Sequence, residues 1–474
     1  MTGSPTVRGW LAIALTGTSL LVGCAPGESG PAAPPHVVLV SLDAVRRDAV
    51  GAFQGDGESV TPELDALSRE SIRFTEAYAQ LPHTLPSHMS MLTGLHPDAH
   101  GVVVAEDRLP PGVETLPRLL GAAGYRCYGL ASNSWLNGEF GFDRGFHHYQ
   151  VFPNGLTFAG RINARLAELL DQSGEKGTPL FLFLHYYDAH SDPNRGADAT
   201  LLPYHAPPEA LARIGVESTS RLFCDEEDRC ASDFLVAANR SRRPVPAESV
   251  ATLRALYLAG VSALDKEIGR LVAELKRRGL WEDALVVVTA DHGEEFREHG
   301  RFVHAQPYVE TLAVPLLVKL PGGRGAGTVV REPVQTCDLL PTILSQVGLP
   351  TPASVQGRAF LPVLDQGGGE PRFVLGRDKH RATRFALRDD RYTLVVDLAQ
   401  EHSAELYDRA SDPGEVRNIA ADRPELIAVM STRLRQLVER NRQAAVALHE
   451  LELEAASPLT EEEKANLRAL GYGE

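Results

Sequence analysis

Residues 36–42 read HVVLVSL, and Asp43 follows them directly. The run is continuously apolar and rich in β-branched residues, a pattern typical of a strand buried on both faces of a parallel sheet. Amphipathic stretches of helical periodicity separate it from its counterparts, so the sequence predicts an α/β fold with a mainly parallel sheet between helices. The counterparts lie at residues 125–131, 179–185, 284–290 and 314–319.

The alternation of strands and helices is interrupted twice. A clear helical pattern spans residues 249–278, but residues 191–250 before it carry several prolines and charges, and a long irregular insert is often a lid or substrate loop. Beyond about residue 370, short strand-like runs and one amphipathic helix predict a small antiparallel sheet with a helix. We therefore expect a main domain over residues 36–370 and a C-terminal subdomain over residues 371–474.

The N-terminus resembles an export signal. Residues 11–22 form an apolar run that is shorter than the roughly 20 residues of a membrane span and suits a secretory signal. Residues 21–24 (LVGC) resemble a bacterial lipobox, although an ordinary signal peptide is the alternative. We expect residues 1–24 to be a lipoprotein signal peptide with the lipobox Cys24, and Cys24 to become the lipidated first residue of the mature protein. Residues 25–35 should then be a tether, and the protein should be exported and attached to the bacterial cell envelope only through the lipid.

The charge balance limits the partners. The chain has 62 acidic and 47 basic side chains, which gives a formal net charge of -15. Such a chain repels phosphate backbones, so a nucleic-acid binder is excluded on electrostatic grounds. An anionic substrate would require a local positive site, which a bound metal ion could supply.

The cysteines indicate at most one disulfide. Cys224 and Cys230 flank a short acidic loop and could pair in an oxidising compartment, or they could be two free thiols on a surface loop. Cys127 and Cys337 are expected to be buried. No two cysteines have the CxxC spacing, so the sequence does not support a thiolate zinc site.

Acidic residues and a histidine follow two of the predicted strands. Asp43 follows the first, and Asp291-His292 follow the run at 284–290. Ligands of parallel α/β sheets bind at the carboxyl ends of the strands. Carboxylate oxygens with an imidazole suit Zn, Mn or a harder ion such as Ca, so we expect one divalent metal ion there. An aspartate after a strand is, however, also a common helix cap or turn residue.

Residues 83–94 (HTLPSHMSMLTG) contribute a candidate nucleophile. Pro86 suits the first turn of a helix and Gly94 its end, so Thr84 would lie at the helix N-terminus, where backbone N–H groups favour an anion. A threonine hydroxyl is a weak nucleophile unless metal coordination displaces its proton. Thr84 could therefore be a metal ligand and nucleophile, or a plain helix cap.

These motifs and others in the same order resemble the sulfatase family of the alkaline phosphatase superfamily. The likeness runs from about residue 36 to the end and implies an alkaline-phosphatase-like sheet, metal ligands at Asp43, Asp291 and His292, and Thr84 at the nucleophile position. The matching segments are DAVRRD at 43–48, TPELD at 61–65, TLPSH at 84–88, LTG at 92–94, HYYDAH at 185–190, DHGE at 291–294, EHG at 298–300, VPLLVK at 314–319, ELYD at 405–408 and DPGE at 412–415.

The chain departs from the family pattern at several of these positions. Sulfatases have a Cys or Ser that is converted to formylglycine where this chain has Thr84, and an Arg where it has His88. The usual second Asp is Ala44, and Ser132-Asn133 replace a Gly-Lys-Trp-His type run. Threonine at the nucleophile position is similar to superfamily members that act on phosphate esters.

We therefore expect a metal-dependent hydrolase of anionic phosphate esters, either phosphodiesters or phosphonate monoesters, with a covalent intermediate on Thr84. His190 and His304 are candidates to protonate the leaving group or to hold a non-bridging oxygen. His88 could orient the nucleophile, and Asn133 could bind an equatorial oxygen. Two alternatives are sulfate ester hydrolysis without formylglycine and a non-catalytic envelope binding protein.

Overall fold

The computed structural model describes residues 34–55, 58–152, 159–173, 177–191, 202–204, 207–217, 221–225, 230–241, 244–361 and 372–455. The predicted signal segment with Cys24, most of the predicted tether and parts of the 191–250 insert lie outside these residues. Within the described residues, no helix combines the length and the apolar character needed to cross a membrane.

Eight strands form the central sheet, in the order β12-β2-β11-β7-β1-β6-β4-β5. Neighbours from β7 to β5 pair in parallel, as do β12 and β2, whereas β11 is antiparallel to both β7 and β2. The predicted mainly parallel sheet is therefore confirmed. The strands are β1 (His36–Leu42), β2 (Ile72–Phe74), β4 (Arg126–Ala131), β5 (His148–Val151), β6 (Leu180–Tyr186), β7 (Ala284–Ala290), β11 (Leu316–Lys319) and β12 (Val329–Val330).

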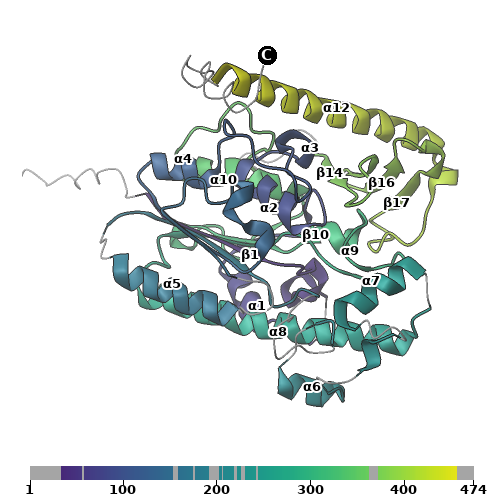
Figure 1. The fold of residues 1–474 in the computed structure, drawn as a ribbon, viewed down its shortest axis with the longest axis horizontal. Coiled ribbons are helices and arrows are strands. Elements are labelled where there is room, and N and C mark those ends of the chain that lie inside the picture. The colour runs from purple at the N-terminus through teal and green to yellow at the C-terminus, as the bar shows by residue number, and fades with distance from the viewer. Residues whose placement is uncertain are drawn as a thin grey trace, which may run out of the picture. The chain divides into compact units, whose positions relative to one another are not determined.

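Helices cover both faces of this sheet (Figure 1). The continuous apolar runs of β6 and β7 are buried along their whole length because neither face meets solvent. One face carries α1 (Pro62–Arg69), α5 (Ala159–Ser173) and α8 (Ala247–Arg277). The other carries α2 (Thr84–Thr93), α4 (Leu116–Ala122) and α10 (Leu339–Gln346).

Two sequence predictions about this domain need correction. The run at 314–319 is not one strand, because Pro315 separates β10 (Ala313–Val314) from β11 and the two belong to different sheets. The 191–250 insert is not irregular throughout its described part: it contains α6 (Pro208–Ile214) and α7 (Ala231–Ser241). Both helices contact the main domain, α6 through α8 and α7 through β9 (Phe302–Val303).

The C-terminal subdomain has the predicted form. Its sheet has the order β14-β15-β16-β17, all pairs antiparallel, and α12 (Pro424–Ala455) packs across it (Figure 1). Met430, Leu434 and Val438 of α12 share a buried cluster with Phe385 and Leu394 of the sheet. The strands are β14 (Val374–Arg377), β15 (Arg384–Arg388), β16 (Tyr392–Asp397) and β17 (Glu405–Asp408).

Besides the central sheet and the C-terminal sheet, the fold has a small sheet and a ribbon made of short strands. A three-stranded sheet has the order β10-β3-β13, and β8 pairs with β9 in an antiparallel ribbon. The other α-helices and short strands are α3 (Pro97–His100), α9 (Val309–Leu312), β3 (Ala77–Tyr78), β8 (Glu295–Phe296) and β13 (Val334–Gln335).

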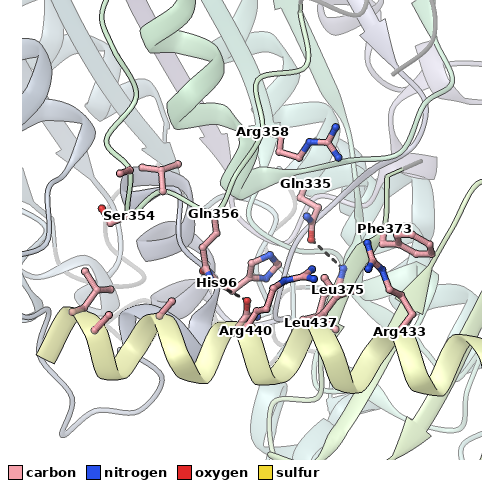
Figure 2. Close-up of a pocket in the computed structure, with 16 residues that line it drawn as sticks. His96, Gln335, Ser354, Gln356, Arg358, Phe373, Leu375, Arg433, Leu437 and Arg440 are labelled. Carbon is pink, nitrogen blue, oxygen red and sulfur yellow. Dashed lines mark hydrogen bonds between the residues drawn. The ribbon is translucent and has the colours of Figure 1, made fainter. Parts of the chain in front are cut away.

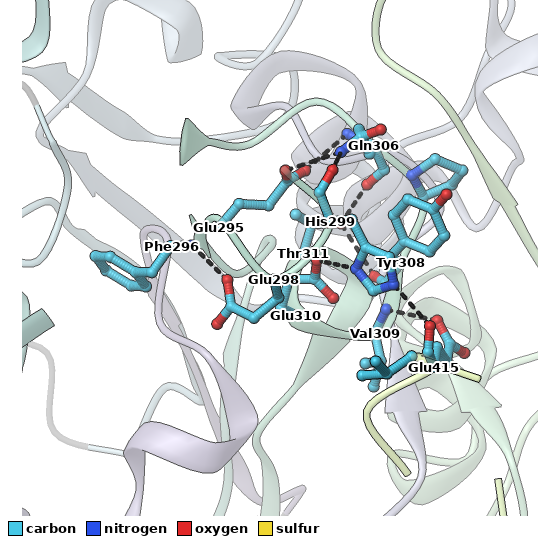
Figure 3. Close-up of polar contacts among 12 residues, drawn as sticks. Glu295, Phe296, Glu298, His299, Gln306, Tyr308, Val309, Glu310, Thr311 and Glu415 are labelled. Carbon is cyan, nitrogen blue, oxygen red and sulfur yellow. Dashed lines mark hydrogen bonds and ion pairs between the residues drawn. The ribbon is translucent and has the colours of Figure 1, made fainter. Parts of the chain in front are cut away.

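Polar contacts join the subdomain to the main domain around Glu415. Its carboxylate pairs with Arg388 at 3.1 Å and accepts the backbone N–H of Val309, and both charged side chains are fully buried. Its backbone carbonyl accepts a hydrogen bond from His299, whose other nitrogen contacts Glu310 at 2.6 Å (Figure 3). Burial opposes protonation of His299, but the hydrogen bond to Glu310 raises its pKa to about 9, so this histidine is charged at neutral pH.

Replacing Glu415 with glutamine should destabilise the fold by about 3 kcal/mol, because it leaves the Arg388 guanidinium buried without a counter-charge. The free energy of unfolding from urea titration measures this. Asp408→Ala is the control, since its partner Arg391 has 54% of its side chain exposed and water replaces the lost contact. An equal shift of the unfolding midpoint in both variants would contradict the role assigned to the buried pair.

Candidate active site and metal centre

Four neighbouring strands bring the candidate residues to one edge of the sheet. Asp43 follows β1, Asp291 follows β7, His185 lies near the end of β6, and Asn133 comes two residues after β4. Because these strands are parallel, their carboxyl ends meet at the same edge. The sheet thus collects residues that are far apart in the sequence.

Three fully buried side chains here each have one atom without a hydrogen-bond partner: Asp43 Oδ1, Asp291 Oδ2 and His292 Nε2. The imidazole nitrogen lies 3.4 Å from Asp291 Oδ2 and 3.8 Å from Asp43 Oδ1. Buried polar atoms are almost always paired, so three unpaired acceptors that lie close together favour a bound cation. The donor set of two carboxylates and an imidazole fits a divalent metal ion.

The remaining atoms of these ligands are held in place by the protein. Asp291 Oδ1 accepts the N–H groups of Ala44 and His292, at 3.1 and 2.9 Å. Asp43 Oδ2 accepts from His185 Nε2 at 3.1 Å and from Asn133 Nδ2 at 3.3 Å. Each carboxylate therefore has one oxygen fixed and one free, the arrangement that orients a metal ligand.

The electrostatics of the ligands also favour a cation. Burial, and next the charge of Asp43, raise the pKa of Asp291 above its usual range. His292 is oriented by its own backbone: Nδ1 contacts the carbonyl of Gly293 at 2.9 Å, which leaves Nε2 free to coordinate. Gly293 itself must be a glycine, since a Cβ there would lie 2.1 Å from the carbonyl oxygen of Glu310.

His88 and His185 also lie close to Asp291, but the ring nitrogens of both are engaged in hydrogen bonds, so they are poorer candidates for a metal site. His88 Nδ1 lies 2.8 Å from the carbonyl of Thr84, and its Nε2 lies 2.8 Å from Ser41 Oγ, so both ring nitrogens are engaged. Burial lowers the pKa of His88 to about 3 and that of His185 to about 4. Both are neutral and serve as hydrogen-bonding supports.

Thr84 is the first residue of α2, as its predicted place at a helix N-terminus requires. Gly94 ends this helix with a positive φ of 68°, and Pro86 lies in the first turn. The Thr84 hydroxyl lies 3.5 Å from Asp43 Oδ2, and the residue is 1% exposed. His88 contacts the carbonyl of Thr84 and not its hydroxyl.

A cavity of about 340 Å³ reaches Thr84 from the protein surface. His190 and His304 line it, as the sequence analysis expected, and their ring centroids are 5.1 Å apart. Asn133 does not line it, so its predicted contact with substrate has no support here, and its amide instead holds Asp43. The lining residues are His83, Thr84, Val103, Val104, Ala105, Trp135, Tyr187, His190, His304, Lys379 and His380.

His304 is part of a buried hydrogen-bonded chain that was not predicted. Its Nδ1 lies 2.8 Å from Glu294 Oε2, and the hydroxyl of Tyr204 donates to Glu294 Oε1 at 2.7 Å. Burial raises the pKa of Glu294 to about 8, although the Tyr204 hydrogen bond opposes this, and burial lowers the pKa of His304. At neutral pH the chain is therefore a protonated carboxyl beside a neutral imidazole, and His304 Nε2 is the nitrogen left for the cavity.

Lys379 is another residue of the site that sequence reasoning missed. It lies between β14 and β15 in the C-terminal subdomain, and its backbone N–H donates to the carbonyl of Ala305 at 2.9 Å. Burial lowers its pKa to about 8, while Glu294 and Asp43 oppose the shift. The subdomain thus adds a lysine to the lining of the cavity that also contains Thr84, and the only sequence signal for it is the Lys379-His380 pair in this turn.

None of the described residues of the 191–250 insert lines the cavity, and among them the Tyr204 hydroxyl contacts the site through Glu294. The role of the insert as a lid or substrate loop stays a prediction, because many of its residues lie outside the described ranges. Cys224 and Cys230 of the insert are joined in a disulfide bond, while Cys127 and Cys337 are free and buried.

Comparisons with known proteins agree with this architecture. The family model "Sulfatase" matches residues 35–349, and the model "N-sulphoglucosamine sulphohydrolase, C-terminal" matches residues 297–443. The uncharacterized sulfatase YidJ of Escherichia coli K12 is 25% identical over 82% of this chain and 83% of its own length. The multifunctional alkaline phosphatase superfamily protein PehA of Trinickia caryophylli is 28% identical over 82% of this chain and 91% of its own.

A solved structure shares the fold. The phosphonate monoester hydrolase of Agrobacterium radiobacter superposes with a TM-score of 0.64 at 20% identity, covering 90% of this chain and 99% of its own. The family match spans more than half of the chain and includes the proposed metal ligands and Thr84. The chain belongs to the sulfatase family of the alkaline phosphatase superfamily, and it is an ester-hydrolysing enzyme.

Proposed function

We propose that this enzyme hydrolyses phosphate esters, either phosphodiesters or phosphonate monoesters, with Thr84 as the nucleophile. The observation that carries the proposal is the Thr84 hydroxyl at the inner end of the cavity, 3.5 Å from Asp43 Oδ2. Oxidation of a threonine side chain would give a ketone and not the aldehyde of formylglycine. A nucleophilic hydroxyl that attacks phosphorus is the chemistry open to this side chain.

The reaction begins when Thr84 Oγ1 attacks the phosphorus atom. A bond forms between this oxygen and phosphorus, the bond to the leaving oxygen breaks, and water later cleaves the phosphothreonine to regenerate the hydroxyl. Asp43, Asp291 and His292 would hold the divalent ion, which when bound supplies Lewis acidity that lowers the pKa of the threonine hydroxyl and shields the anion. The Thr84 hydroxyl donates a hydrogen bond to Asp43 Oδ2, which orients the oxygen; this carboxylate takes the proton as the oxygen attacks and returns it when water releases Thr84.

The leaving oxygen takes its proton from His304 in this proposal. Glu294 is protonated at neutral pH and contacts Nδ1, so the proton of the neutral imidazole resides on Nε2, which is the nitrogen available to the cavity. As Nε2 gives its proton to the leaving oxygen, Glu294 can return one to Nδ1. His190, which stacks on Tyr187 with ring centroids 4.4 Å apart, holds a non-bridging oxygen.

Hydrolysis of a sulfate ester without formylglycine is the second candidate, because the family model that matches the chain is that of sulfatases. The two candidates separate on a panel of an aryl sulfate, a phosphomonoester, a phosphodiester and a phosphonate monoester, each assayed with the purified full chain and added Zn²⁺, Mn²⁺ or Ca²⁺. We expect kcat/KM to be highest for the phosphodiester or the phosphonate monoester. A higher value for the aryl sulfate would overturn the proposal.

Lys379 should govern the binding of the anionic substrate. In Lys379→Met we expect KM to rise about tenfold, equivalent to about 1.4 kcal/mol, with a smaller change in kcat. Because the pKa of Lys379 is lowered to about 8, the ammonium is present below this pH and lost above it, so the wild-type KM should rise as pH increases through 8.

Two further variants test this assignment. Lys379→Arg should keep KM low above pH 8, because a guanidinium stays protonated. Lys266→Ala, which removes an exposed lysine from α8, should behave as the wild type. A wild-type KM that is flat between pH 7 and 9 would refute the role of the Lys379 ammonium.

A further inference from the structure

A cavity of about 640 Å³ lies outside the active site, between α12 and the segment at residues 353–358 (Figure 2). Three of the residues that line it are arginines, Arg358, Arg433 and Arg440, and its described lining includes no Asp or Glu. The chain as a whole carries a net charge of -15, so its composition does not lead us to expect a cavity in which every side chain charged at neutral pH is positive. Its volume is in the range of small-molecule binding sites.

The three guanidinium groups lie outside salt-bridge distance of the protein's carboxylates among the described residues, although Asp338 accepts the backbone N–H of Arg358 at 2.8 Å and its carboxyl feels the Arg358 charge. None of the three forms an ion pair with the part of the chain that the structure describes. Arg433 packs over the ring of Phe373 at 4.9 Å, and its buried Nε has no hydrogen-bond partner. Figure 2 shows Arg433 and Arg440 extending from α12 toward the cavity, with Arg358 on the opposite side. The guanidinium groups are therefore available to a ligand.

A buried amide adds a second unsatisfied donor. Asn441 is 5% exposed and lines the cavity; its Oδ1 accepts a hydrogen bond from Gln356, but its Nδ2 has no partner. His96, also in the lining, contributes no charge, because burial and next the charge of Arg440 lower its pKa to about 4. The unsatisfied groups, Arg433 Nε and Asn441 Nδ2, are both hydrogen-bond donors. A ligand with acceptor atoms and negative charge would be complementary to them.

Apolar side chains form the rest of the wall. Leu375 comes from β14 and Phe373 directly precedes this strand, while Leu437, Ala444 and Leu448 come from α12. We propose that this cavity binds a small amphiphilic anion, with a carboxylate or phosphate headgroup at Arg433, Arg440 and Asn441 and an apolar body along α12.

This site is separate from the catalytic one and does not depend on the proposed function. Thr84 is at the N-terminal end of α2, whereas His96 follows the C-terminal end of the same ten-residue helix. At 1.5 Å per residue, the ends of α2 are about 15 Å apart. A ligand bound to the Arg433 cavity would therefore not touch the nucleophile.

Calorimetric titration of the full chain with four probes tests the proposal. Decanoate and decyl phosphate carry both a charged headgroup and an apolar body, decanol lacks the charge, and inorganic phosphate lacks the body. We expect at least one of the two amphiphilic anions to bind tenfold or more tightly than decanol and inorganic phosphate. Failure of both anions to bind, or equal affinity for decanol, would overturn it.

Variants locate the binding event. Arg440 is exposed on α12, so Arg440→Ala should fold and should weaken binding of the amphiphilic anion at least tenfold. Arg442→Ala is the matched control, because Arg442 is exposed on the same helix but does not line the cavity. Ala444→Phe should also block binding by filling space, whereas Thr84→Ala should bind normally. Equal weakening in Arg442→Ala, or loss in Thr84→Ala, would place the ligand elsewhere and refute the site.

Discussion

Replacing Thr84 with alanine should lower kcat for a phosphodiester at least about a thousandfold, because it removes the atom that forms the covalent intermediate. The change deletes a hydroxyl and a methyl group from a residue that is 1% exposed at the start of α2, and the backbone contacts of His88 and Ser87 remain available to hold the helix. Thr84→Ser keeps the hydroxyl and should retain measurable turnover. Initial rates at saturating substrate and metal provide the comparison.

The matched control is Thr93→Ala at the other end of the same helix. Its hydroxyl donates to the carbonyl of Met89 and lies outside the catalytic cavity, so this variant should keep its kcat even if its stability falls. Rapid acid quench followed by mass spectrometry should detect a phosphorylated peptide that contains Thr84 in the wild type and not in Thr84→Ala. Full activity of Thr84→Ala would eliminate the covalent mechanism.

The fold was predictable where local pattern and burial agree. The run at 36–42 became β1 without a shift of boundary, because a strand buried on both faces is built mostly from apolar residues. The helix predicted over 249–278 was observed as α8 (Ala247–Arg277), and the start and end of α2 followed the proline and glycine rules. The polar residues directly after β1 and β7 were predicted to converge, and their unpaired atoms do.

The rest of the site depends on tertiary packing that leaves no local signal. Lys379 reaches the cavity because the turn after β14 is hydrogen-bonded to Ala305 in the main domain, a contact between distant segments. The pairing of Tyr204 with Glu294 likewise joins the insert to a residue 90 positions away. Asn133 was a candidate to bind substrate because Ser132-Asn133 replace the Gly-Lys-Trp-His type run of sulfatases, but this position also lets its amide reach Asp43. A sequence pattern does not separate these two uses.

Removing one metal ligand should have opposite effects on stability with and without the ion. In Asp291→Asn the amide oxygen can still accept the N–H groups of Ala44 and His292, so the local backbone is preserved. The lost charge should reduce metal content per chain and lower kcat at least about a thousandfold. With metal in excess, the wild type should therefore be the more stable protein, by about 2.7 kcal/mol when the free ion is at 100 times its Kd.

After chelation the order should reverse. Burial and the charge of Asp43 raise the folded-state pKa of Asp291, so in the ion-free protein the ionised carboxylate destabilises the fold, and this effect appears as pH rises above the unfolded-state pKa. Asp291→Asn removes that carboxylate and should have the higher Tm in chelator at neutral pH. The control is Asp265→Asn, a buried aspartate that accepts the N–H groups of Glu63 and Leu64 and should keep its metal content. If chelator lowers the Tm of Asp291→Asn as much as that of the wild type, Asp291 is not a ligand of the ion.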